Sequence, residues 1–111
     1  MDAAALREYE TALLKLQADL RSEIDSSSEA RTAAIDGRIG RSGDTLHAQQ
    51  LASEMNRRRQ ARLKLIPSAL QRIRQGAFGL CAACRHPINT PRLNAFPEAL
   101  FCINCQRDRM L

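Results

Sequence analysis

Two Cys-x2-Cys pairs are the feature that most constrains this chain. Cys81 pairs with Cys84, Cys102 pairs with Cys105, and seventeen residues separate the two pairs. Each pair can turn two thiols to one side of a tight knuckle, and two facing knuckles supply the four ligands of a closed tetrahedral zinc site. We therefore predict one structural Zn2+ bound by these four cysteines.

Disulfides and a redox dithiol are the alternatives for the same cysteines. Disulfides need an oxidising compartment, and the chain does not start with a charged segment followed by an apolar secretory stretch. We therefore expect a cytoplasmic protein with reduced thiols. His86 lies two residues past Cys84 and is poorly placed to replace a ligand. With four thiolates committed, no open position for catalysis is expected.

The aromatic content limits the kind of core that the chain can form. Its 111 residues include one Tyr, three Phe and no Trp, whereas compact cores normally depend on large rings. Apolar residues that are mainly Leu, Ile and Ala are more easily buried along a seam between helices. No apolar run approaches the length of a membrane span. We predict a mainly α protein without a membrane segment.

An apolar stripe marks a first helix over residues 3–26. Asp2 is a candidate N-cap, and the alanines after it favour helix. Ser26, Ser27 and Ser28 compete for backbone hydrogen bonds, so the helix is expected to fray there. The stripe has spacings of three and four residues and consists of Leu6, Tyr9, Leu13, Leu16, Leu20 and Ile24.

A second stripe predicts a helix from about residue 44 to residue 74. Pro67 lies inside it, and either kinks the helix or begins a new one. Gly76 is a candidate left-handed cap at its end. The stripe consists of Leu51, Met55, Leu63 or Arg62, Ile66, Leu70 and Ile73. At a rise of ~1.5 Å per residue, the first helix would be about 35 Å long and the second roughly 45 Å.

These elements predict an antiparallel helical hairpin, or two-helix coiled coil, followed by a metal module. We place the hairpin at residues 1–75 with its tip near 29–45. The four-cysteine zinc finger occupies residues 76–111 and ends in a short helix from Ile103 to Met110. The thiolates of Cys102 and Cys105 lie near the positive end of that helix.

The net charge of +5 is unevenly distributed. Residues 1–30 carry seven acidic and three basic side chains, whereas residues 31–75 carry three acidic and ten basic ones. An acidic helix can therefore lie against a basic one. A possible basic contact face for phosphates or an acidic protein consists of Arg57, Arg58, Arg59 and Arg62, with Lys64 beside it.

Residues 66–108 resemble the zinc-finger signature of the DksA/TraR family of bacterial transcription regulators. The resemblance rests on the knuckle spacing, on the order of hairpin before zinc finger, and on a set of matching residues. These are Ala69 to Ile73, Gly76, Phe78 to Cys81, Cys84, Ile88, Arg92, Leu93, Ala95, Pro97, Cys102, Ile103, Cys105 and Gln106.

The resemblance implies a partner and a mode of action. Members of this family bind RNA polymerase directly, insert the hairpin tip into its secondary channel, and need no specific DNA site. On this basis we expect a transcription regulator whose tip residues Arg38, Arg41 and Asp44 contact the polymerase. No sequence-specific DNA contact is expected.

The chain departs from the family pattern at two places. A well-known member carries two aspartates and an alanine at the tip, where an ungapped alignment places Arg38, Arg41 and Gly43 here. Two basic positions that help that member bind the alarmone ppGpp are Phe96 and Gln106 in this chain. The acidic tip is thus absent in that register, and ppGpp dependence is expected to be weak or absent.

Two other functions fit the sequence, whereas enzyme activity is not expected. Neither His47 nor His86 is paired in sequence with a carboxylate or a serine motif that would indicate catalysis. A zinc-dependent nucleic-acid binder would use the basic residues from Arg57 to Lys64. A thiol sensor would lose its zinc on oxidation of the cysteines.

Overall fold

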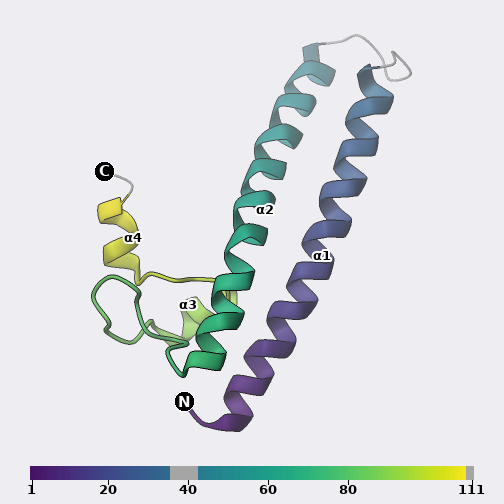
Figure 1. Cartoon of the computed structure of the whole chain (residues 1–111). Helices are drawn as coiled ribbons and strands as arrows, with labels where there is room; N and C mark the ends of the chain where they lie inside the picture. Colours follow the sequence, from purple (N-terminus) through teal and green to yellow (C-terminus); the bar gives the residue numbers. More distant parts are fainter. Residues whose placement is uncertain (36–42, 110–111) are drawn as a thin grey trace. The chain divides into compact units, whose positions relative to one another are not determined.

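The computed structural model describes residues 1–35 and 43–109, with side chains described for residues 1–26 and 46–109. It contains the helices α1 (Ala3–Ile35), α2 (Gly43–Gln75), α3 (Thr90–Ala95) and α4 (Ile103–Arg109). Within these residues no strand forms, and Leu80 and Pro87 make an isolated β-bridge. The predicted fold class, a mainly α chain with a hairpin before a small four-cysteine module, is confirmed (Figure 1).

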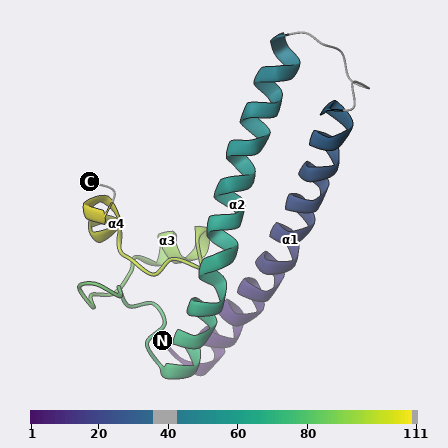
Figure 2. The same ribbon diagram turned by 45° about the horizontal axis from the view of Figure 1, so that its top comes forward.

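The chain forms two compact units. The first combines Met1–Leu16 with Lys64–Leu111, and the second is Gln17–Leu63. In the first unit, the start of α1 lies beside the end of α2, with α3 and α4 in the segment that follows α2 (Figure 2). The zinc module and the base of the hairpin therefore share one unit.

Helix α1 begins where the sequence predicts and extends further than predicted. The Ala5 amide donates to Asp2 Oδ1 at 2.8 Å, which is the N-cap bond expected of Asp2. The predicted end near residue 26 is wrong, because α1 continues to Ile35. A serine costs well under about 1 kcal/mol in a helix interior, and Ala30, Ala33 and Ala34 after the serines are strong helix formers.

Helix α2 runs without a break through Pro67, so the alternative of two separate helices is excluded. The Pro67 side chain is exposed, which keeps its ring out of the packed seam. At the C-terminus, the Ala77 amide donates to the Arg72 carbonyl and the Gly76 amide to the Ile73 carbonyl. Gly76 has a φ of +73°, so the helix ends in a Schellman motif with the predicted glycine.

The first unit contains most of the buried apolar side chains. Helices α1 and α2 contribute Leu13, Ile66 and Ala69, which are fully buried. The remaining core residues come from the segment after α2 and are Phe78, Cys81, Ile88 and Leu93. Apolar burial thus joins the hairpin base to the zinc module.

The seam of the second unit is more polar. Leu20 of α1 is buried there as predicted, but the buried residue that α2 contributes is Asn56, which is 5% exposed. Leu51 and Met55 were predicted to face the seam and are instead 51% and 42% exposed. Residues four and then three positions before Leu63 are Arg59 and Asn56, which lie on the same face of α2. The inward face of α2 in this unit therefore includes polar residues.

Two short helices complete the zinc module. Helix α4 begins at Ile103 as predicted, and the last residue of its predicted range, Met110, lies outside the described residues. Helix α3 was not predicted. Its sequence signal is Pro91, which occupies the first turn of α3, where a proline costs no hydrogen bond.

Candidate metal centre

The first knuckle is a tight turn held by backbone hydrogen bonds. The Arg85 amide donates to the Cys81 carbonyl at 2.9 Å, and the Cys81 amide donates to the His86 carbonyl at 2.8 Å. Arg85 has a φ of +64°, the left-handed conformation that lets the chain turn back after Cys84. This geometry directs Cys81 and Cys84 to the same side of the turn.

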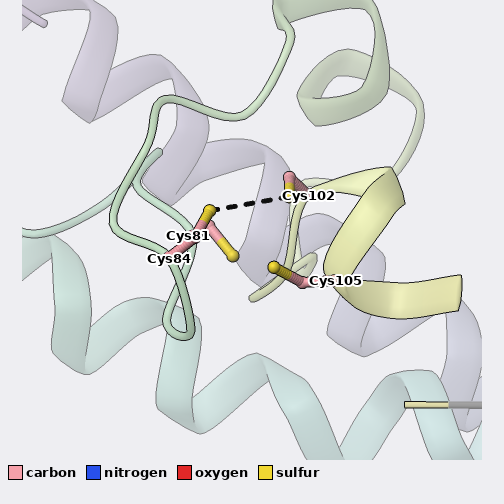
Figure 3. A group of neighbouring side chains, drawn as sticks. All are labelled: Cys81, Cys84, Cys102 and Cys105. Carbon is pink, nitrogen blue, oxygen red and sulfur yellow. Dashed lines mark hydrogen bonds between the residues drawn. The ribbon is translucent and has the colours of Figure 1, made fainter. Parts of the chain in front are cut away.

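The second knuckle joins the chain before α4 to its first turn. The Gln106 amide donates to the Cys102 carbonyl at 2.9 Å, and the Ala82 amide in the first knuckle donates to the Leu100 carbonyl at 2.8 Å. The two knuckles are therefore connected through the backbone. Figure 3 shows all four cysteine side chains converging, two from each knuckle.

The four sulfur atoms fit a tetrahedral zinc ion. All four lie within 4.8 Å of one another, and the Sγ atoms of Cys84 and Cys102, joined by the dashed line in Figure 3, are 3.8 Å apart. A regular tetrahedron with Zn–S bonds of about 2.3 Å requires sulfurs separated by about 3.8 Å. All four cysteines are free of disulfides.

The four thiols lie close enough to shift one another's pKa values. Burial raises the pKa of Cys81, but backbone hydrogen bonds from Cys84, Cys102 and Ala83 outweigh it and lower that pKa to about 5. Hydrogen bonds with the Cys102, Cys81 and Cys84 side chains, together with burial, raise the pKa of Cys105 to about 12. Cysteine binds zinc as the thiolate, so metal binding at these four residues releases protons.

Two arginines support the knuckles through backbone carbonyl groups. Arg72, near the end of α2, donates from Nη2 to the carbonyls of Ala77 and Leu80, at 3.2 and 2.8 Å. Arg92 in α3 donates from Nε to the Phe101 carbonyl at 3.2 Å. These carbonyls belong to segments that lead into Cys81 and Cys102. Both arginines are among the residues on which the family resemblance rests, but neither was predicted to have a structural role.

The predicted tip residues lie largely outside the described structure. Arg38 and Arg41 are outside the described residues. Asp44 belongs to the first turn of α2, and its side chain is outside the described part. Their contact with a polymerase stays a prediction.

The four arginines of the predicted basic face point in different directions. Arg57 and Arg58 are exposed, and Arg58 pairs with Glu54 four residues earlier at 3.2 Å. Arg59 and Arg62 are half-buried. The side chain of Arg59 is 22% exposed and pairs with Glu23 of α1 at 3.1 Å. At least one of these arginines therefore serves the hairpin itself.

The two residues at the predicted ppGpp positions offer no positive charge. Phe96 is exposed and lines an open cavity of about 650 Å3 beside Cys84, Cys102 and Cys105. Gln106 is half-buried in α4. An aromatic ring and a neutral amide cannot form ion pairs with phosphate groups, which agrees with the expected weak ppGpp dependence. That dependence itself stays a prediction.

Helices in the described part of the chain all fall short of the apolar length that a bilayer crossing would require.

A four-thiolate centre that follows a helical hairpin defines a protein of the C4 zinc-finger class. Residues 76–109 match the family model of the prokaryotic dksA/traR C4-type zinc finger, and this stretch includes all four cysteines. Residues 76–109 are therefore similar to the dksA/traR C4-type zinc finger, and the four cysteines bind one structural Zn2+.

Whole-chain similarity is found with a solved structure. The fold is similar to that of transcription factor DksA2 from Pseudomonas aeruginosa, with a TM-score of 0.72 and 24% identity over 99% of this chain and 86% of that chain. The chain is thus DksA-like in its zinc finger and its fold.

A curated relative is similar over part of its length. An uncharacterized protein from Aquifex aeolicus (strain VF5) is 30% identical over 66 residues, which are 60% of this chain and 46% of that protein. The match therefore spans less than half of the length of that relative.

Proposed function

We propose that the protein is a non-catalytic transcription regulator that binds RNA polymerase directly and places its hairpin tip in the secondary channel. The observation that supports this most strongly is a combination of two features in one chain. A zinc finger of the DksA/TraR family follows a helical hairpin, and the whole fold is similar to that of a protein described as a transcription factor.

The proposal divides the work between the two parts of the chain. The zinc ion and the buried residues around it keep the base of the hairpin folded, and the residues between α1 and α2, together with the first turn of α2, make the contact. In this proposal Arg38, Arg41 and Asp44 meet the polymerase. Four thiolate ligands fill a tetrahedral site, so the zinc has a structural role and activates no water.

A binding assay with purified core RNA polymerase tests the proposal. We expect the zinc-loaded protein to co-migrate with the polymerase and to compete with a known secondary-channel factor. The double substitution Arg38→Ala/Arg41→Ala should weaken this competition. Arg57→Ala, an exposed arginine of α2, is the matched control and should leave it unchanged. Absence of both co-migration and competition at micromolar protein would contradict the proposal.

Nucleic-acid binding has less support, because Arg58 and Arg59 are already paired with Glu54 and Glu23. A phosphate-binding protein would lose affinity steeply as salt rises, with a slope set by the number of contacts. A steep salt dependence of RNA or DNA binding, together with no polymerase binding, would favour this function instead.

A further inference from the structure

Tyr9 belongs to α1 but makes its contacts with the zinc module. Its hydroxyl donates to Asn94 Oδ1 at 2.8 Å. Its ring lies 5.1 Å from the ring of Phe78 with an interplanar angle of 48°, a separation typical of favourable aromatic pairs. All three residues belong to the first compact unit. Tyr9 therefore joins the first helix to two separate segments of the metal module.

The two partners of Tyr9 lead to different knuckles. Phe78 is buried and lies three residues before Cys81, in the segment that enters the first knuckle. The neighbouring Gly79 accepts a hydrogen bond from the Ile88 amide at 2.8 Å, which closes that knuckle at its base. A shift of the first knuckle would therefore be transmitted directly to the ring of Phe78.

Asn94 belongs to α3 and is connected to the second knuckle. In the same helix, Leu93 is buried and Arg92 binds the carbonyl of Phe101, the residue before Cys102. A shift of the second knuckle would therefore move α3 and the amide that Tyr9 contacts. Tyr9 requires both knuckles in place at once, which is the condition that a zinc ion shared by four cysteines imposes.

We propose that Tyr9 couples the metal centre to α1. Zinc holds the two knuckles together and keeps Phe78 and Asn94 at the separation that Tyr9 bridges, and Tyr9 in return stabilises the metal-binding conformation. The element with two states is the zinc module, which is folded with zinc and unfolded without it. Because such coupling is reciprocal, a residue of α1 contributes to zinc affinity although it contacts no ligand. This coupling is independent of polymerase binding.

Zinc affinities of full-length variants, measured by competition with a chromophoric chelator, test the coupling. Tyr9→Ala should lower the zinc association constant by about 5- to 150-fold, the usual range for coupled sites. Tyr9→Phe keeps the ring and loses only the hydrogen bond, so the loss should be smaller, about two- to tenfold.

Leu14→Ala is the matched control, because Leu14 is a large, exposed side chain of the same helix. It should leave the zinc association constant within about twofold of the wild-type value, as expected of a surface substitution. A Tyr9→Ala protein with wild-type zinc affinity would overturn the proposal.

The wild-type protein provides a second readout that needs no variant. Tyr9 is the only tyrosine and the chain has no tryptophan, so the intrinsic emission reports on this side chain alone. Removal of zinc should make the emission more accessible to acrylamide quenching, and zinc addition should reverse the change. A quenching constant that is the same with and without zinc would also overturn the proposal, even if Tyr9→Ala fails to fold.

Discussion

Arg85 shows how a single backbone conformation shapes the metal centre. It is exposed and has a φ of +64°, which costs a residue with a side chain roughly 1–2 kcal/mol. The Cys-x2-Cys spacing identifies the ligands but does not reveal that the residue after Cys84 must turn left-handed. The fold retains this strain because the Arg85 amide closes the knuckle on the Cys81 carbonyl.

Arg85→Gly should therefore stabilise the zinc-loaded protein. Glycine adopts positive φ without a steric cost but loses more entropy on folding, so the net gain should be about 0.5–1 kcal/mol in the free energy of unfolding. Urea denaturation followed by circular dichroism measures this. Arg85→Ala is the control, since it keeps the Cβ atom and should give no gain. Equal stabilisation by both variants would assign the effect to lost charge instead.

The helices show which elements a sequence pattern predicts and where it fails. The cap residues Asp2 and Gly76 and the start of α4 at Ile103 were predicted, because each depends on local backbone chemistry. The predicted seam was wrong at Leu51 and Met55. These residues were assigned to the seam because they are apolar, although they do not continue the face that includes Leu63. The true face includes Asn56, a polar residue that hydropathy cannot identify as buried.

The polar seam makes a prediction about Asn56. A buried Asn in a helical seam fixes register at a cost in stability, and here Asn56 Oδ1 accepts a hydrogen bond from Arg59 at 3.0 Å. Asn56→Leu should raise the free energy of unfolding by about 1–2 kcal/mol, because Arg59 keeps its partner Glu23. Urea denaturation of the zinc-loaded protein measures the change.

The exposed neighbour Met55 supplies the comparison for this prediction. Met55→Leu should change the free energy of unfolding by less than about 0.5 kcal/mol, as expected of a surface site. A destabilising Asn56→Leu would contradict the prediction. It would mean that the hydrogen bond from Arg59 contributes more to the free energy of unfolding than a buried leucine side chain does.

At the scale of the whole molecule, stability depends on two different sources. The unit of Met1–Leu16 and Lys64–Leu111 combines an apolar core with a zinc centre, whereas the unit of Gln17–Leu63 has a buried Leu20 and a buried Asn56. The zinc ligands could be predicted from spacing alone. The contact of Tyr9 with Asn94 could not, because 85 residues separate the two in sequence.

Chelation should therefore act on the two units unequally. Structural zinc in finger peptides contributes on the order of 10–16 kcal/mol, so its removal should unfold the segment 76–109. Hydrogen exchange with mass spectrometry should show lost protection there, while amides near Leu20 and Asn56 keep most of theirs. Equal loss in both segments would mean that the second unit has no stability of its own.

The most direct test of the account is the metal content of protein purified under reducing conditions without added metal. Elemental analysis by mass spectrometry should find one zinc per chain, and the double substitution Cys102→Ser/Cys105→Ser should abolish it. Wild-type protein with no stoichiometric zinc, or a double variant that keeps its zinc, would contradict the four-thiolate centre on which the fold of the module and the proposed function depend.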